Sequence, residues 1–263
     1  MIQKIRPSVC IDSVFEGVAL PEACRKVAEA QLPAIEFWSW WDKDLSELED
    51  SVAENGLTIS GCCTKFVSLV DPGLRESYLE GLAESREAAE RLQAPILISQ
   101  VGDFREGASR EEQRECLIEG LREAAAVLEG SDQTLVIEPL NERIDHAGYF
   151  LIRSDEAFEI VRQVGSEKIQ VVFDIYHQQI SEGDVIRKFT ENIDQIAHFH
   201  AAGNPGRHEL QSGELHYPNI FSAIADTTYE GFVGLEYWPV DPDPVGALRE
   251  AGSWFAKLNG GEK

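Results

Sequence analysis

Four short apolar runs in the second half of the chain each end in a residue that can bind a hard metal ion. These end residues are Glu138, Asp174, His200 and Glu236. They lie 36, 26 and 36 residues apart (138 to 174, 174 to 200, 200 to 236), about one strand–loop–helix unit each. Side chains at the C-terminal ends of parallel strands converge on one face of a barrel. Three carboxylates and one imidazole there favour Mg²⁺, Mn²⁺ or Co²⁺ over a structural zinc ion.

The elements that would position these residues alternate along the whole chain. We expect strands near residues 8–12, 34–38, 57–62, 95–101, 134–140, 169–175, 196–201 and 232–237, and helices near 20–31, 45–54, 78–92, 109–128, 155–164, 184–193, 219–225 and 245–258. The strand runs are continuous and rich in Val and Ile, which is typical of strands buried on both faces. Ser109 and Glu112 form the pattern of a capping box at the start of one helix.

This alternation predicts an α/β fold, a single-domain (β/α)8 TIM barrel over residues 1–263, with the metal site at the C-terminal face of strands 5–8. An open doubly wound sheet is the alternative. It is less favoured because the segment after the first strand, DSVFEG at 12–17, is not a glycine-rich phosphate loop.

Composition narrows the classes of partner. A net charge of −24 argues against nucleic acid and anionic membranes, which need Lys and Arg as counter-charges. The five cysteines include no CxxC pair and fit reduced structural thiols. The segment MIQKIRP at 1–7 has no apolar signal-peptide core, and no run is long enough to span a membrane, so we expect a cytoplasmic protein. A homo-oligomer is possible, but no sequence feature requires one.

Three further residues are candidates for substrate binding. His177 is expected on the loop after the sixth strand, where it either reaches a substrate hydroxyl or is solvated. Arg207 lies in a Gly/Pro-rich loop and is a candidate clamp for an anionic group, the alternative being an ion pair with Glu209 or Glu214. Lys65, after the third strand, either assists or is an ordinary surface lysine.

The two histidines of the seventh strand are expected to play different parts. We expect His198 and His200 to point to opposite sides, with His200 at the metal and His198 packed against a helix or behind the ligands. Glu36, at the end of the second strand, is expected to line the mouth of the barrel. Trp38 and Trp238 either wall the site or pack between barrel and helices.

Several segments of the second half resemble the xylose isomerase-like TIM-barrel superfamily, most closely its hydroxypyruvate isomerase branch, with the D-tagatose 3-epimerase branch as a near relative. The segments are IEPLN at 137–141, FDIYHQQ at 173–179, NPGRHE at 204–209, GELHYP at 213–218 and GFVGLEY at 231–237. The resemblance implies that Glu138, Asp174, His200 and Glu236 bind one divalent metal ion. It also implies that Glu138 and Glu236 form the acid/base pair and that His177 and Arg207 contact the substrate.

Two residues depart from the hydroxypyruvate isomerase pattern. Glutamine is common there at the position of His200, where histidine is more like the sugar epimerases, and asparagine is common at the position of His216. The resemblance implies that the substrate is a small sugar or oxo-acid.

These observations predict a metal-dependent isomerase that interconverts α-hydroxy-carbonyl compounds through an enediolate. A ketose 3-epimerase and a keto-polyol dehydratase on the same barrel are alternatives. An endonuclease IV-type phosphodiesterase fits the acidic composition poorly. A non-catalytic sugar-binding barrel is the remaining alternative.

Overall fold

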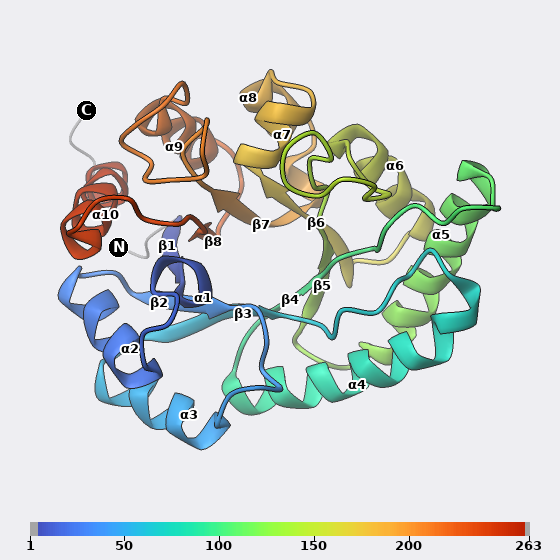
Figure 1. The fold of residues 1–263 in the computed structure, drawn as a ribbon, viewed down its shortest axis with the longest axis horizontal. Coiled ribbons are helices and arrows are strands. Elements are labelled where there is room, and N and C mark those ends of the chain that lie inside the picture. Colours follow the sequence, from blue (N-terminus) through green and yellow to red (C-terminus); the bar gives the residue numbers. More distant parts are fainter. Residues whose placement is uncertain (1–4, 261–263) are drawn as a thin grey trace.

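Eight parallel strands close into one barrel, confirming the expected fold (Figure 1). The computed structural model describes residues 5–260. The first four residues of the segment discussed for a signal peptide lie outside this range. The strands are β1 (Arg6–Cys10), β2 (Ala34–Phe37), β3 (Thr58–Cys63), β4 (Ile96–Ser99), β5 (Thr134–Ile137), β6 (Ile169–Asp174), β7 (Ile196–Ala201) and β8 (Phe232–Leu235). Each pairs in parallel with its chain neighbours, and β8 closes the ring on β1.

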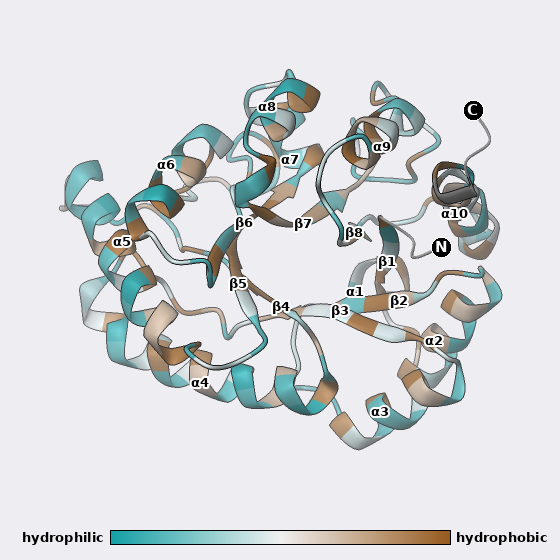
Figure 2. Ribbon diagram, turned by 180° about the vertical axis from the view of Figure 1, so that it is seen from behind, coloured by the Kyte–Doolittle hydropathy of each residue, from teal (hydrophilic) through white to brown (hydrophobic). Residues whose placement is uncertain are grey.

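Helices surround this ring, as both ribbon views show (Figures 1 and 2). They are α1 (Ile11–Val14), α2 (Leu20–Glu29), α3 (Leu45–Glu54), α4 (Arg75–Leu92), α5 (Arg110–Val127), α6 (Ser154–Val164), α7 (Ile175–Ser181), α8 (Val185–Glu191), α9 (Tyr217–Ala225) and α10 (Pro244–Gly260). The capping box of Ser109 and Glu112 is present at the start of α5. None of the helices within residues 5–260 is both long and apolar enough to cross a membrane.

Helix α7 corrects one expectation, because it occupies the segment that was expected to be a loop. It begins directly after β6, and the Asp174 carboxylate accepts a hydrogen bond from the main-chain N–H of His177 at 3.0 Å. A carboxylate that caps the first turn in this way stabilises the start of a helix. His177 therefore lies on a helix whose first turn is anchored by a predicted metal ligand.

The main apolar core lies between the strands and the helices. Phe173 of β6 and Phe199 of β7 pack against each other at a tilt, and both meet Phe189 of α8 edge to face. A second, smaller cluster includes Cys63 of β3 and Val136 of β5. The strand register also aligns the C-terminal ends of neighbouring strands: Asp174 of β6 pairs with His200 of β7. This alignment brings the ends of β5–β8 to one face of the barrel.

Candidate active site

The four predicted metal ligands come together at the C-terminal ends of β5–β8. One potential ligand atom from each of Glu138, Asp174, His200 and Glu236 lies within 4.8 Å of those of the other three, and all four residues are buried. The Nδ1 atom of His200 is 2.9 Å from Oε1 of Glu138, 3.7 Å from Oε2 of Glu236 and 4.0 Å from Oδ2 of Asp174. Nδ1 is therefore the nitrogen that faces the carboxylates.

Burial and the repulsion between neighbouring carboxylates shift the pKa values of this cluster. Burial raises the pKa of Glu138 and of Asp174, and the nearby charge of Glu236 raises both further, against the lowering effect of His200. For His200, the surrounding carboxylates outweigh burial and raise its pKa well above the ordinary value. Closely spaced carboxylates that resist ionisation together are stabilised by a cation placed between them.

The donor set fits a divalent metal ion. Three carboxylates and one imidazole nitrogen suit Mg²⁺, Mn²⁺ or Co²⁺, and the buried negative charge needs a cation to offset it. Glu138, Asp174, His200 and Glu236 are the residues that could hold such an ion.

Both carboxylate oxygens of Glu236 have a side-chain partner. Its Oε1 accepts a hydrogen bond from Nε1–H of Trp38 at 2.6 Å, and its Oε2 pairs with the guanidinium of Arg207. Burial alone would raise the pKa of Glu236, but Arg207, His200 and the Trp38 hydrogen bond together lower it. The pKa values of Glu138 and Glu236 are therefore shifted in opposite directions.

His177 is held in one tautomer. Asn141 donates to Nδ1 of His177 from its main-chain N–H at 3.2 Å, and its side-chain Nδ2 lies 2.6 Å from the same atom. Because Nδ1 accepts, the ring proton is on Nε2, which is buried, 3.7 Å from Oδ2 of Asp174, and has no hydrogen-bond partner among the described residues. Burial, followed by the positive charge of Arg207, lowers the pKa of His177 well below its ordinary value. His177 therefore offers a neutral, unused N–H donor beside the cluster.

Arg207 extends over the cluster from the loop after β7. Its side chain is 11% exposed, and its guanidinium lies 5.5 Å from the Tyr176 ring centre and 5.0 Å from that of Trp238. The main-chain N–H of Trp238 donates to the Arg207 carbonyl at 2.9 Å, which ties this loop to the segment after β8. The carboxylate partner of Arg207 is Glu236, so the alternative pairing with Glu209 or Glu214 is wrong. Its Nε is buried and has no partner within residues 5–260.

Lys65 is directed toward the outer helices. Its ammonium pairs with Glu84 of α4 and lies 5.6 Å from the Trp40 ring centre. The role of Lys65 in substrate binding stays a prediction.

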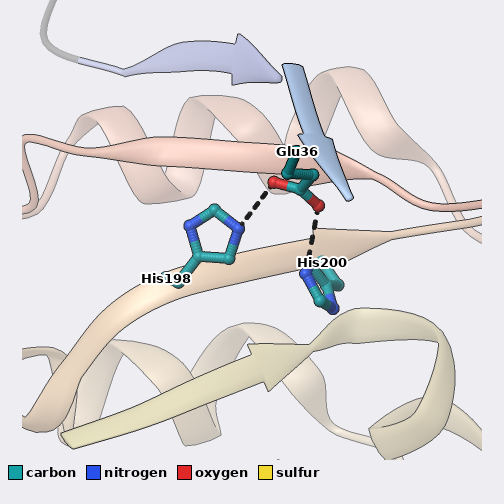
Figure 3. Close-up of side chains that lie close together, drawn as sticks. All are labelled: Glu36, His198 and His200. Atoms are coloured by element: carbon teal, nitrogen blue, oxygen red, sulfur yellow. Dashed lines mark hydrogen bonds and ion pairs between the residues drawn. The ribbon is translucent and has the colours of Figure 1, made fainter. Parts of the chain in front are cut away.

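The expected orientation of His198 is wrong. Side chains alternate along a strand with a period of two residues, so His198 and His200 share a face, and both point into the barrel toward Glu36 (Figure 3). Nε2 of His198 lies 3.0 Å from Oε2 of Glu36, and Nε2 of His200 lies 3.2 Å from Oε1. Glu36 is 2% exposed and contacts the inner side of His200 rather than lining the mouth. The two histidines outweigh burial and lower the pKa of Glu36.

Asn141 was missed as a site residue. Its signal in the sequence is weak, an asparagine three residues after the predicted ligand Glu138. Its contact with His177 is visible only in the structure. Trp38 was considered as a wall of the site, and its hydrogen bond to Glu236 spans 198 residues of sequence.

The chain as a whole is similar to a known family of proteins. Residues 24–258 match the family model described as xylose isomerase-like TIM barrel. The chain belongs to the xylose isomerase-like TIM-barrel family. Among similar proteins, the hydroxypyruvate isomerase of Escherichia coli is 31% identical to this chain over 223 residues, which cover 81% of this chain and 86% of that protein. The 2-oxo-tetronate isomerase of Cupriavidus necator is 42% identical over 132 residues, half of each chain. Because the chain belongs to this family and both relatives are isomerases, the chain is an isomerase.

Solved structures of the same architecture superpose along almost the whole chain. A Brucella melitensis protein described as an AP endonuclease of family 2 gives a TM-score of 0.88 at 28% identity, covering 97% of this chain and 99% of that one. An L-ribulose 3-epimerase gives a TM-score of 0.81 at 16% identity, covering 97% and 95%. At 16% identity, the likeness concerns the fold alone.

Proposed function

We propose that this protein is a metal-dependent isomerase of a short 2-oxo acid that carries a hydroxyl group beside its carbonyl, such as hydroxypyruvate. The observation that carries the proposal is a pair of buried, unpartnered N–H donors, Nε2 of His177 and Nε of Arg207, beside a cluster with two glutamates. Buried donors without partners are costly, and a substrate oxygen would satisfy them. The E. coli hydroxypyruvate isomerase supports the same substrate class.

The two glutamates divide the proton transfer. Glu236 is held ionised by Arg207, His200 and Trp38, so it takes the proton from the carbon beside the carbonyl. Glu138, whose pKa is raised by burial, supplies a proton to the former carbonyl carbon. The hydroxyl proton moves to the former carbonyl oxygen, so the old hydroxyl carbon becomes the new carbonyl. Glu236 then releases its proton to solvent and Glu138 takes one up, which restores both groups. A divalent ion held by the four ligands would polarise the carbonyl and offset the negative charge of the enediolate.

Arg207 and His177 bind and orient the substrate. The guanidinium of Arg207 reaches this cluster, and it suits a carboxylate, which an oxo-acid has and a neutral ketose lacks. His177 donates from Nε2 to the carbonyl or hydroxyl oxygen. Trp38, Tyr176 and Trp238 lie around these groups and keep water from the reacting carbon.

A ketose 3-epimerase is the second candidate. His200 favours it, because histidine at this position resembles the epimerases more than the hydroxypyruvate isomerases. Return of the proton to the opposite face of the same carbon, instead of to its neighbour, would give this outcome.

The test is turnover in deuterated water, followed by proton NMR, of the Mn²⁺- or Mg²⁺-loaded protein with hydroxypyruvate, tartronate semialdehyde, short oxo-acids and ketohexoses. We expect deuterium beside the carbonyl and a new aldehyde or ketone isomer with an oxo-acid, both abolished by EDTA. The Arg207→Gln variant should lose kcat/KM for the oxo-acid by about 10–100-fold, the usual worth of a charged hydrogen bond. Exchange with ketohexoses alone, giving an epimer, would favour the second candidate. No exchange with any compound would contradict both.

A further inference from the structure

We infer that Glu36 is a positioning residue for the metal site: it holds the ring of His200 from inside the barrel so that Nδ1 is presented to the ion. This inference deepens the proposed function and rests on the metal site assigned there. Glu36, His198 and His200 lie close together inside the barrel (Figure 3), and His200 also belongs to the cluster of Glu138, Asp174 and Glu236.

The contacts divide the two ring nitrogens of His200 between two tasks. Nε2 lies 3.2 Å from Oε1 of Glu36, an ion-pair contact outside hydrogen-bond geometry in this structure, while Nδ1 lies 2.9 Å from Oε1 of Glu138 and faces the other ligands. A carboxylate behind a ligating histidine fixes the tautomer and the orientation of its ring. With the proton on Nε2, the lone pair of Nδ1 is directed at the ion.

Glu36 is itself held on its other oxygen. Oε2 accepts a hydrogen bond from Oγ–H of Ser60 at 2.9 Å and lies 3.0 Å from Nε2 of His198. Ser60 is in turn 2.6 Å from the hydroxyl of Ser8. All of these residues are buried, so the carboxylate is shielded from bulk solvent.

Small residues on β1 and β8 leave space inside the barrel for the contact between Glu36 and His200. Glu36 on β2 reaches β7 across β1 and β8, where Ser8 and Gly234 form a register pair, and Gly234 also pairs with His200. A Cβ atom at Gly234 would lie 2.1 Å from Oε1 of Glu36. A larger residue at position 234 would therefore displace the carboxylate from His200.

A second metal ion held by Glu36, His198 and His200 is the competing interpretation, because these residues also offer ligand atoms close together. The structure favours the positioning role. Oε2 of Glu36 is already engaged by Ser60 and His198, and His200 would have to bridge two ions through both ring nitrogens.

The experiment compares metal binding by the wild-type protein and the Glu36→Gln variant after EDTA treatment, with Mn²⁺ or Co²⁺ titrated by calorimetry. A neutral amide has a single acceptor oxygen and cannot serve both histidines. We expect one ion per chain in each protein and a Kd raised about 10–100-fold in the variant, the usual effect of losing such a partner. ¹⁵N NMR of labelled histidines in the Mg²⁺-loaded proteins, where the diamagnetic ion leaves the signals sharp, should show a single Nε2–H tautomer for His200 only in the wild type.

The matched control is Glu182→Gln. The Glu182 side chain is buried like that of Glu36, at 1% exposed, but it pairs with Lys188 and Ser154 outside the barrel, so metal affinity should not change. Should Glu36→Gln not fold, Ser60→Ala removes one hydrogen bond to Glu36 and should raise the Kd severalfold. If Glu36→Gln does fold, adding Ser60→Ala to it should produce no further loss.

An unchanged Kd in folded Glu36→Gln, or in Ser60→Ala where that variant is the test, would overturn the positioning role while leaving the proposed function in place. So would an equal loss in Glu182→Gln, or two ions in the wild type and one in Glu36→Gln. A wild-type protein that binds no divalent ion would overturn both proposals.

Discussion

At the scale of a residue, the contacts of His177 with Asn141 decide which ring nitrogen carries the proton. Two donors from Asn141 occupy Nδ1, so the ring presents N–H at Nε2 and not a lone pair. The pKa of His177 lies well below its ordinary value, so the ring stays neutral around neutral pH. The neutral ring can donate its Nε2–H to an oxygen that gains negative charge during the reaction, and it needs no change of protonation state to do so.

We predict that His177→Gln lowers kcat/KM about 10²–10³-fold, the usual cost of losing a donor to a developing oxyanion. Metal affinity should stay close to that of the wild type, since His177 is not among the four ligands. Steady-state kinetics together with a metal titration would check this. Glu182→Gln again serves as the control, and a His177→Gln variant with full activity would exclude His177 from the reaction.

At the scale of elements, one strand end serves two purposes. Asp174 ends β6 as a predicted metal ligand and at the same time caps α7 through the main chain of His177. The position of His177 is thus coupled to the position of a ligand. In the same way, the loop after β7 is tied to the segment after β8 by the hydrogen bond from Trp238 to Arg207.

The outer helices contribute stability without taking part in the chemistry. Ser109 caps α5, with its hydroxyl and the Glu112 side chain satisfying each other's main-chain N–H groups. We predict that Ser109→Ala lowers the free energy of unfolding by about 1 kcal/mol, a typical cost for a lost N-cap. Urea unfolding would measure this, with activity unchanged. Ser253→Ala, which removes an exposed hydroxyl within α10, is the control and should change stability little. Equal losses in the two variants would contradict the capping role.

At the scale of the whole molecule, the barrel brings residues from four strands, far apart in sequence, into the one cluster that we propose binds a metal ion. Since the unfolded chain has no such site, the ion should bind the folded state and stabilise it. A metal at 100 times its Kd should add about 3 kcal/mol to the free energy of unfolding. For a chain of this size, that corresponds to a rise in Tm of roughly 5–10 °C.

The stabilisation by metal should grow with pH. Without the ion, the folded-state pKa of His200 is raised by Glu138, Glu236 and Glu36, so its charged form stabilises the fold at low pH and this contribution is lost as pH rises through that pKa. The metal must displace the proton from His200, and protons from Glu138 and Asp174 where these are bound.

We therefore predict a larger rise in Tm on adding Mn²⁺ at pH 8 than at pH 6, measured by thermal unfolding against EDTA-treated protein. Calorimetry in buffers of different ionisation enthalpy should show proton release. Equal Tm shifts at both pH values would show that no ligand loses a proton on binding.

The net charge of −24 also acts on the molecule as a whole. An acidic surface repels anions at a distance, so an oxo-acid substrate needs a local positive group, and Arg207 supplies it at the cluster. This same acidity argues against nucleic acid as a partner.

The sequence alone determined the barrel and the four strand-end residues, because both depend on local pattern. Strand–helix alternation repeats through the chain, and Glu138, Asp174, His200 and Glu236 each end a run of apolar residues. Closure of eight parallel strands then forces these ends onto one face.

Only the tertiary structure decided what lies behind and beside these ligands. Glu36 contacts His198 across 162 residues of sequence and Trp38 contacts Glu236 across 198, because β2 faces β7 and β8 inside the closed ring. The tautomer of His177 likewise depends on Asn141, 36 residues away. A local sequence pattern cannot predict which side chains meet across the barrel. Such contacts depend on strand register, on strand order and on the space that a glycine leaves at position 234.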